Sequence, residues 1–98
     1  MKIYYSPIFV ERLHEILNFY DKRNGNSVFS RKILKVIYKQ INLLSVMPQI
    51  GRSTVFPDVR ILFIDRFGIE YQIRGNIILI VNIYSSQTSV ETRFFEKK

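Results

Sequence analysis

The chain has 98 residues, of which 47% are hydrophobic and 14% aromatic, so it can bury one core and is not disordered by composition. Fifteen Lys and Arg against eight Asp and Glu give a formal charge of +7, which predicts a polyanionic partner such as nucleic acid or an acidic protein. The absence of cysteine excludes disulfides and thiolate metal sites, and a single histidine argues against zinc, so we expect one domain over residues 1–98 with no metal and no cofactor.

The first predicted elements are a short strand and a helix. Residues 2–6 (KIYYS) favour a strand that Pro7 stops. Ser6 before Pro7 predicts a helix start, because the serine oxygen can accept from first-turn amides and proline needs no donor there. The helix should end near Asn24 and Gly25, since glycine permits the left-handed closing residue. Its apolar face consists of Phe9, Leu13, Ile16, Leu17 and Tyr20.

A second helix is predicted to begin at Asn26 or Ser27 and to lie antiparallel to the first. Its buried stripe consists of Phe29, Ile33, Val36, Ile37, Ile41 and Leu44. Its other side carries Arg31, Lys32, Lys35 and Lys39. No acid occurs between Asp21 and Asp58, so the basic excess is concentrated in the middle third of the chain. This basic face is either a solvated surface or a docking site.

An irregular connection follows, in which Pro48, Gly51 and Pro57 interrupt regular structure. After it, three strands are expected over residues 59–64, 69–74 and 77–84. The predicted fold class is therefore α+β, with a short N-terminal strand, a two-helix antiparallel hairpin and a three-stranded antiparallel sheet.

The dipeptide Gly75-Asn76 predicts a two-residue hairpin turn, which sets the register of the last two strands. The implied pairs are Arg74 with Ile77, Ile73 with Ile78 and Tyr71 with Ile80. One face, expected against the helices, contains Ile69, Tyr71, Ile73, Ile78 and Ile80. The other face mixes Glu70, Gln72 and Arg74 with Leu79, Val81 and Ile83. Because that face is more aliphatic than a solvated sheet face usually is, we expect something to cover it.

This element order, in a short and strongly basic chain, resembles the RelE/ParE superfamily of type II toxins. Three short motifs carry the resemblance. They are Met47-Pro48-x-x-Gly51-Arg52, the Val59-Arg60 opening of a strand, and Tyr71 within FGIEYQIRGNIILIVNI. The resemblance implies a RelE/ParE-like fold and a toxin that is neutralised by an antitoxin, whose extended C-terminal segment wraps the toxin. It also implies that the arginines after the loop line a basic concave binding face.

The resemblance implies two alternative activities. ParE-like toxins bind DNA gyrase and trap it on cleaved DNA, and the Gly-Arg loop and the lack of an obvious acid–base set favour this branch. RelE-like toxins cleave mRNA in the ribosome, which requires proton transfer and stabilisation of the phosphorane, and the candidate catalytic residues would be Arg60 and Tyr84. After Tyr84 no Arg, Lys or His occurs until Arg93, which weakens the nuclease hypothesis. A basic binding module without toxicity is the third class.

Antitoxin binding is the partner prediction that the residues support most directly. A net acidic amphipathic segment would place its apolar residues on Leu79, Val81 and Ile83. Its carboxylates would meet Arg52, Arg60 or Arg74. Each of the first two arginines also has a structural interpretation, because Arg52 could bond loop carbonyls and Arg60 could guard a sheet edge. A toxin–antitoxin hetero-oligomer is therefore expected.

The location of the protein is predicted from its apolar segments. MKIYYSPIF lacks a signal-peptide apolar block, and the longest aliphatic run, Ile77 to Val81, is far below the roughly 20 residues that span a bilayer. We therefore expect a soluble cytoplasmic protein without a membrane partner.

Overall fold

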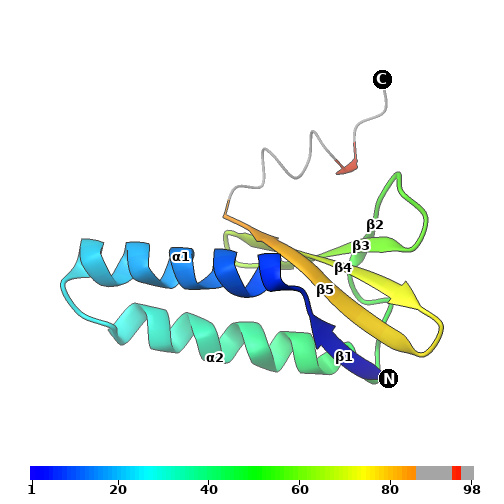
Figure 1. Ribbon diagram of the computed structural model, residues 1–98, viewed down its shortest axis with the longest axis horizontal. Helices are drawn as coiled ribbons and strands as arrows, with labels where there is room; N and C mark the ends of the chain where they lie inside the picture. The colour runs from blue at the N-terminus through cyan, green and yellow to red at the C-terminus, as the bar shows by residue number, and fades with distance from the viewer. Residues whose placement is uncertain (86–93, 96–98) are drawn as a thin grey trace.

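In the computed structural model, which describes residues 1–85 and 94–95, a helical hairpin packs on one face of a five-stranded sheet (Figure 1). The helices are α1 (Pro7–Asn24) and α2 (Val28–Leu43). The strands are β1 (Lys2–Tyr5), β2 (Arg52–Ser53), β3 (Val59–Ile64), β4 (Phe67–Arg74) and β5 (Ile77–Tyr84). No helix among the described residues is long and apolar enough to cross a bilayer.

The ends of the helices follow local chemistry. Ser6 caps α1, because its Oγ accepts from the Phe9 amide at 3.0 Å, and the same hydroxyl donates to the Val81 carbonyl at 2.6 Å. Gly25 closes α1 with a left-handed φ of 73°. The predicted caps of α1 are therefore confirmed. At the start of α2 the side chain of Asn26, rather than that of Ser27, accepts from the Val28 amide.

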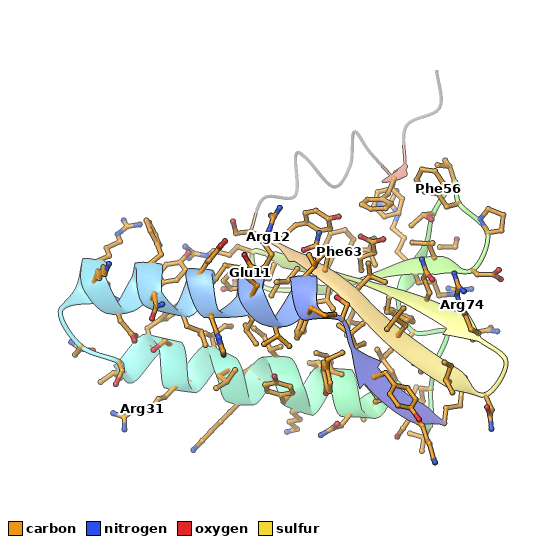
Figure 2. The ribbon with its side chains drawn as sticks, in the orientation of Figure 1. Glu11, Arg12, Arg31, Phe56, Phe63 and Arg74 are labelled. Atoms are coloured by element: carbon orange, nitrogen blue, oxygen red, sulfur yellow. The ribbon has the colours of Figure 1, made fainter. Side chains whose placement is uncertain are left out.

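The buried stripe of α2 is confirmed at four positions, whereas Phe29 is only partly buried and Val36 is exposed. Ile33, Ile37, Ile41 and Leu44 are buried, whereas the side chain of Val36 is 40% exposed. At about 100° per residue, Val36 falls on the border between the apolar stripe and the basic side. Arg31, Lys32, Lys35 and Lys39 are all exposed, and Figure 2 shows Arg31 extending from α2 away from the sheet.

The strands are ordered β1-β5-β4-β3-β2, with β1 parallel to β5 and the other neighbours antiparallel. The predicted three-stranded sheet is therefore wrong in its strand count. The segment that forms β1 was expected as a strand, but nothing local indicates that it pairs with β5, because a parallel partner is never joined by a short turn. The two-residue β2 is too short to give a periodic signal.

The predicted hairpin register is confirmed near the turn and then changes at a β-bulge. Tyr71 pairs with Ile80, but Glu70 pairs with Asn82, so Val81 is an extra residue in β5. The bulge reverses the side on which later residues of β5 point. Ile83, expected on the mixed face, instead pairs with Ile69 and is 1% exposed in the core beneath the helices. Its predicted position on the mixed face is therefore wrong.

Tyr71 belongs to the core between the sheet and the helices. Its side chain is fully buried, as are those of Phe9, Ile37 and Ile80 in the same cluster. The apolar face predicted for the hairpin is therefore the face that the helices cover, and the opposite, outer face of the sheet is left for other contacts.

Candidate functional site

The outer face of the sheet is the surface that the sequence suggests for partner binding. The register places on it Arg52 of β2, Val59, Ile61 and Phe63 of β3, Glu70, Gln72 and Arg74 of β4, and Ile77, Leu79, Asn82 and Tyr84 of β5. Among the described residues no group of histidines and carboxylates could hold a metal ion. This face combines aromatic rings, aliphatic side chains and guanidinium groups with the polar side chains of Glu70, Gln72 and Asn82.

One part of this face, the covered half, lies beneath the two C-terminal phenylalanines. Phe94 is 2% exposed and packs with Ile61, which is fully buried. The ring of Phe94 lies 5.8 Å from that of Phe56 and 5.9 Å from that of Tyr84, and its carbonyl accepts from the Val55 amide. Figure 2 shows Phe56 beside the short segment that contains Phe94 and Phe95. The expectation that something covers the mixed face is thus met, in this half, by the chain itself.

The other part, the open half, lies toward the β4–β5 hairpin and comprises Gln72, Arg74, Ile77 and Leu79. Ile77 and Leu79 are half-buried, and Arg74 is exposed at the end of β4 (Figure 2). The Nε of Arg74 donates to the Gln72 side chain at 3.0 Å. Sequence reasoning missed Ile77, although its predicted pairing with Arg74 already places the two on one face.

The three arginines of the predicted site do not lie together. The guanidinium of Arg52 stacks on the Phe95 ring at 3.8 Å, so it lies at the edge of the covered half. Arg60 pairs with Tyr71 and therefore points to the opposite face from Arg52 and Arg74. Its Nη1 donates to the carbonyls of Gln49 (3.2 Å) and Gly51 (2.7 Å). Arg60 thus has the loop-anchoring role that the sequence suggested for Arg52.

Tyr84 is hydrogen-bonded to the carboxylate of Glu70, which the sequence analysis treated only as a polar position of the mixed face. Its hydroxyl donates to Glu70 Oε1 at 2.8 Å, and the Asn82 amide donates to the same hydroxyl at 3.4 Å. Glu70 is 7% exposed, so this hydrogen bond satisfies a buried acid. The sequence carried no signal for this contact, because it depends on the bulge, which brings Asn82 and Tyr84 to the side of Glu70.

The two candidate catalytic residues are separated. Arg60 pairs with Tyr71, whereas Tyr84 pairs with Gly68, which lies three residues away along β4 on the outer face. This is about 10 Å along the strand at ~3.3 Å per residue, and the side chains point to opposite faces. Arg60 and Tyr84 therefore cannot contact one phosphate in this arrangement.

His14 is exposed on α1, in a cleft between the helices.

The Met47-Pro48-x-x-Gly51-Arg52 motif is fixed from within the fold. The Tyr71 hydroxyl donates to the Pro48 carbonyl at 2.7 Å and accepts from the Gly51 amide at 2.9 Å. Burial raises the pKa of Tyr71 above its ordinary value of 10.0, although the Gly51 amide and the nearby Arg60 charge partly offset this. Tyr71 therefore stays neutral and can donate and accept at once.

Comparison with known proteins gives a consistent result. The sequence model of the ParE toxin of type II toxin–antitoxin systems, parDE, matches residues 3–89. Among curated proteins no sequence matches the chain. Among solved structures, the chromosomal ParDE toxin–antitoxin system from P. aeruginosa is similar, with a TM-score of 0.62 and 20% identity over 88% of this chain and 96% of that chain. At this identity the structural likeness shows a shared fold.

Proposed function

The chain belongs to the ParE toxin family of type II toxin–antitoxin systems, and from this premise we propose that it arrests growth in the cytoplasm by poisoning DNA gyrase, until a cognate antitoxin neutralises it. It acts as an inhibitor that binds its target and performs no chemistry on it. The RelE/ParE-like fold expected from the sequence agrees with this family.

The observation that carries the proposal is the separation of Arg60 from Tyr84. RNA cleavage requires a proton-transfer group and a cation at the same phosphate. The Nη1 of Arg60 donates hydrogen bonds to the carbonyls of Gln49 and Gly51, and the hydroxyl of Tyr84 donates to Glu70 Oε1. Both side chains therefore have structural roles on opposite faces, which supports an inhibitor over a ribonuclease.

The proposal is tested by inducing the chain in a host cell without its antitoxin. We expect growth arrest with an induced DNA-damage response and intact transcripts, and purified toxin should inhibit supercoiling by purified gyrase. Arrest with cleaved transcripts and no DNA damage would instead identify a ribosome-dependent nuclease, and the absence of arrest would leave a binding module without toxicity.

We further propose that the antitoxin docks on the open half of the outer face. Ile77 and Leu79 supply half-buried aliphatic area, and Arg74 supplies an exposed cation at its border. An extended, net acidic segment fits both features, with apolar side chains over β5 and a carboxylate at Arg74. Arg52 at the edge of the covered half extends this surface, whereas Ile83 and Arg60 do not belong to it. Val81 is the bulge residue that the register leaves unpaired.

Reversing the charge of Arg74 tests the docking surface. Arg74→Glu should weaken antitoxin binding at low salt about 10-fold, because it replaces an attractive charge pair by a repulsive one, and the difference should shrink as salt rises. Titration calorimetry with the purified antitoxin measures the loss of affinity at low salt and its dependence on salt. The matched control is Arg23→Glu, a charge reversal at another exposed arginine at the end of α1, which should leave the affinity unchanged. Equal affinities for wild type and Arg74→Glu at low salt would contradict this docking mode.

A further inference from the structure

Residues 46–51, the later part of the connection between α2 and β2, are held through their backbone and expose most of their side chains; we call this segment the presentation loop. Tyr71 binds the Pro48 carbonyl and the Gly51 amide, and Arg60 binds the Gln49 and Gly51 carbonyls. Within the loop the Ile50 amide donates to the Met47 carbonyl at 3.3 Å. Five backbone positions in a row, Met47 to Gly51, are thus hydrogen-bonded. Such a loop has little conformational freedom left to lose.

Three apolar side chains of the presentation loop are exposed to solvent. Val46 is 75% exposed, Met47 52% and Ile50 38%, and Leu43 at the end of α2 adds a further 39% exposed side chain. Single exposed apolar residues are ordinary, but these four fall within eight residues of one another. The core gains little from them, because the loop is held by its backbone. Their arrangement therefore indicates contact with something outside the fold.

The charge around the loop restricts what that contact is. Residues 40–51 contain no charged side chain, although the chain as a whole carries +7, and Lys39 and Arg52 flank this neutral stretch. An apolar centre bordered by charge is the usual composition of a protein–protein contact. Nucleic acid is bound through cations on phosphates, which the loop itself does not offer.

We propose that Val46, Met47 and Ile50 are the contact by which this toxin docks on its target protein, in an apolar pocket whose rim carries carboxylates that meet Lys39 and Arg52. The fixed backbone serves this contact, because a loop already ordered before binding loses little entropy on docking. The inference rests on the proposed function, since it names the surface through which a target-binding inhibitor acts. It shares no apolar residue with the open half, so target and antitoxin contact different apolar side chains, and Arg52 borders both surfaces.

A paired polar substitution tests the proposal. In the full chain, Val46→Ser with Met47→Ser should leave the melting temperature nearly unchanged, because both side chains are largely exposed. The variant should require at least about 10-fold more toxin to arrest growth, as expected when a well-packed apolar anchor is lost. Its affinity for the purified antitoxin should stay within about twofold of wild type. Val46→Ile with Met47→Leu keeps the apolar contact and should retain toxicity.

The matched control is Val28→Ser with Val36→Ser, which removes two similarly exposed valines (64% and 40%) from α2. This control should arrest growth as wild type does. The proposal is overturned if the loop variant arrests growth at the wild-type toxin level, if the control loses toxicity equally, or if the loop variant loses antitoxin affinity, which would make the antitoxin the occupant. If wild type itself causes no arrest, the proposed function fails first and this inference fails with it.

Discussion

Replacing Gly51 with alanine is expected to lower the free energy of unfolding by about 3 kcal/mol, at the upper end of the usual cost of overpacking a core. A Cβ at this position would lie 2.6 Å from the Tyr71 hydroxyl, 2.7 Å from its Cε1 and 3.0 Å from the Ile61 carbonyl. Tyr71 cannot move aside at low cost, because its ring is fully buried and its hydroxyl makes two hydrogen bonds to the loop. The loop must move instead, and those hydrogen bonds lengthen or break.

Thermal unfolding followed by circular dichroism measures this effect. A loss of about 3 kcal/mol corresponds to a melting temperature lower by roughly 10–20 °C for a domain of this size. Ser53→Ala, on the exposed strand β2 two residues later, is the control and should shift stability by less than about 0.5 kcal/mol. Equal melting temperatures for Gly51→Ala and wild type would show that the loop does not need the close approach.

Tyr71→Phe is expected to lower the free energy of unfolding by about 2–6 kcal/mol, although it removes a single oxygen atom. The ring still fills its place in the core, but the Pro48 carbonyl and the Gly51 amide lose their partner, at about 1–3 kcal/mol for each buried polar group left unsatisfied. Chemical denaturation should show a lower midpoint with an unchanged slope, since the area exposed on unfolding stays the same. Tyr4→Phe, at a side chain that is 49% exposed, should be close to neutral.

The pH dependence gives an independent check on Tyr71. Its pKa in the folded protein is raised above 10.0, chiefly by burial, so its contribution to stability is complete below pH 10 and is lost as pH rises through the folded pKa. The difference in unfolding free energy between wild type and Tyr71→Phe should therefore narrow above pH 10. The raised pKa of Tyr5, caused by burial and then by Tyr38, acts equally in both proteins and cancels. A difference that stays constant above pH 10 would contradict the assignment.

Local chemistry was sufficient to predict the helices and the turn near the C-terminal hairpin. Ser6, Gly25 and Gly75-Asn76 act within a few residues of themselves, and each has the role that the sequence indicates. The pairs from Arg74 with Ile77 to Tyr71 with Ile80 follow from the turn alone. The family membership also followed from short motifs in order, although none of them states which side of the sheet its residues face.

Non-local contacts account for what the sequence could not predict. The bulge at Val81 has no pattern of its own in β5, yet it moves Ile83 into the core and Tyr84 to Glu70. Its carbonyl accepts from Ser6 Oγ, which is 75 residues away in the chain, so the contact exists only in the folded protein. Arg60 was similarly ambiguous, because its role depends on a loop whose carbonyls are positioned by Tyr71.

The parallel pairing of β1 with β5 has a consequence for how the protein is made. Lys2 pairs with Ile77, so the first and last of the five strands are neighbours, and β5 separates β1 from β4. During synthesis the helical hairpin can form from nearby contacts, but the sheet cannot close before β5 has left the ribosome. A polypeptide interrupted before Ile77 would lack β5, which links β1 to β4, and with it Ile78, Ile80 and Ile83 of the core. Only translation that continues past Tyr84 therefore yields the complete sheet.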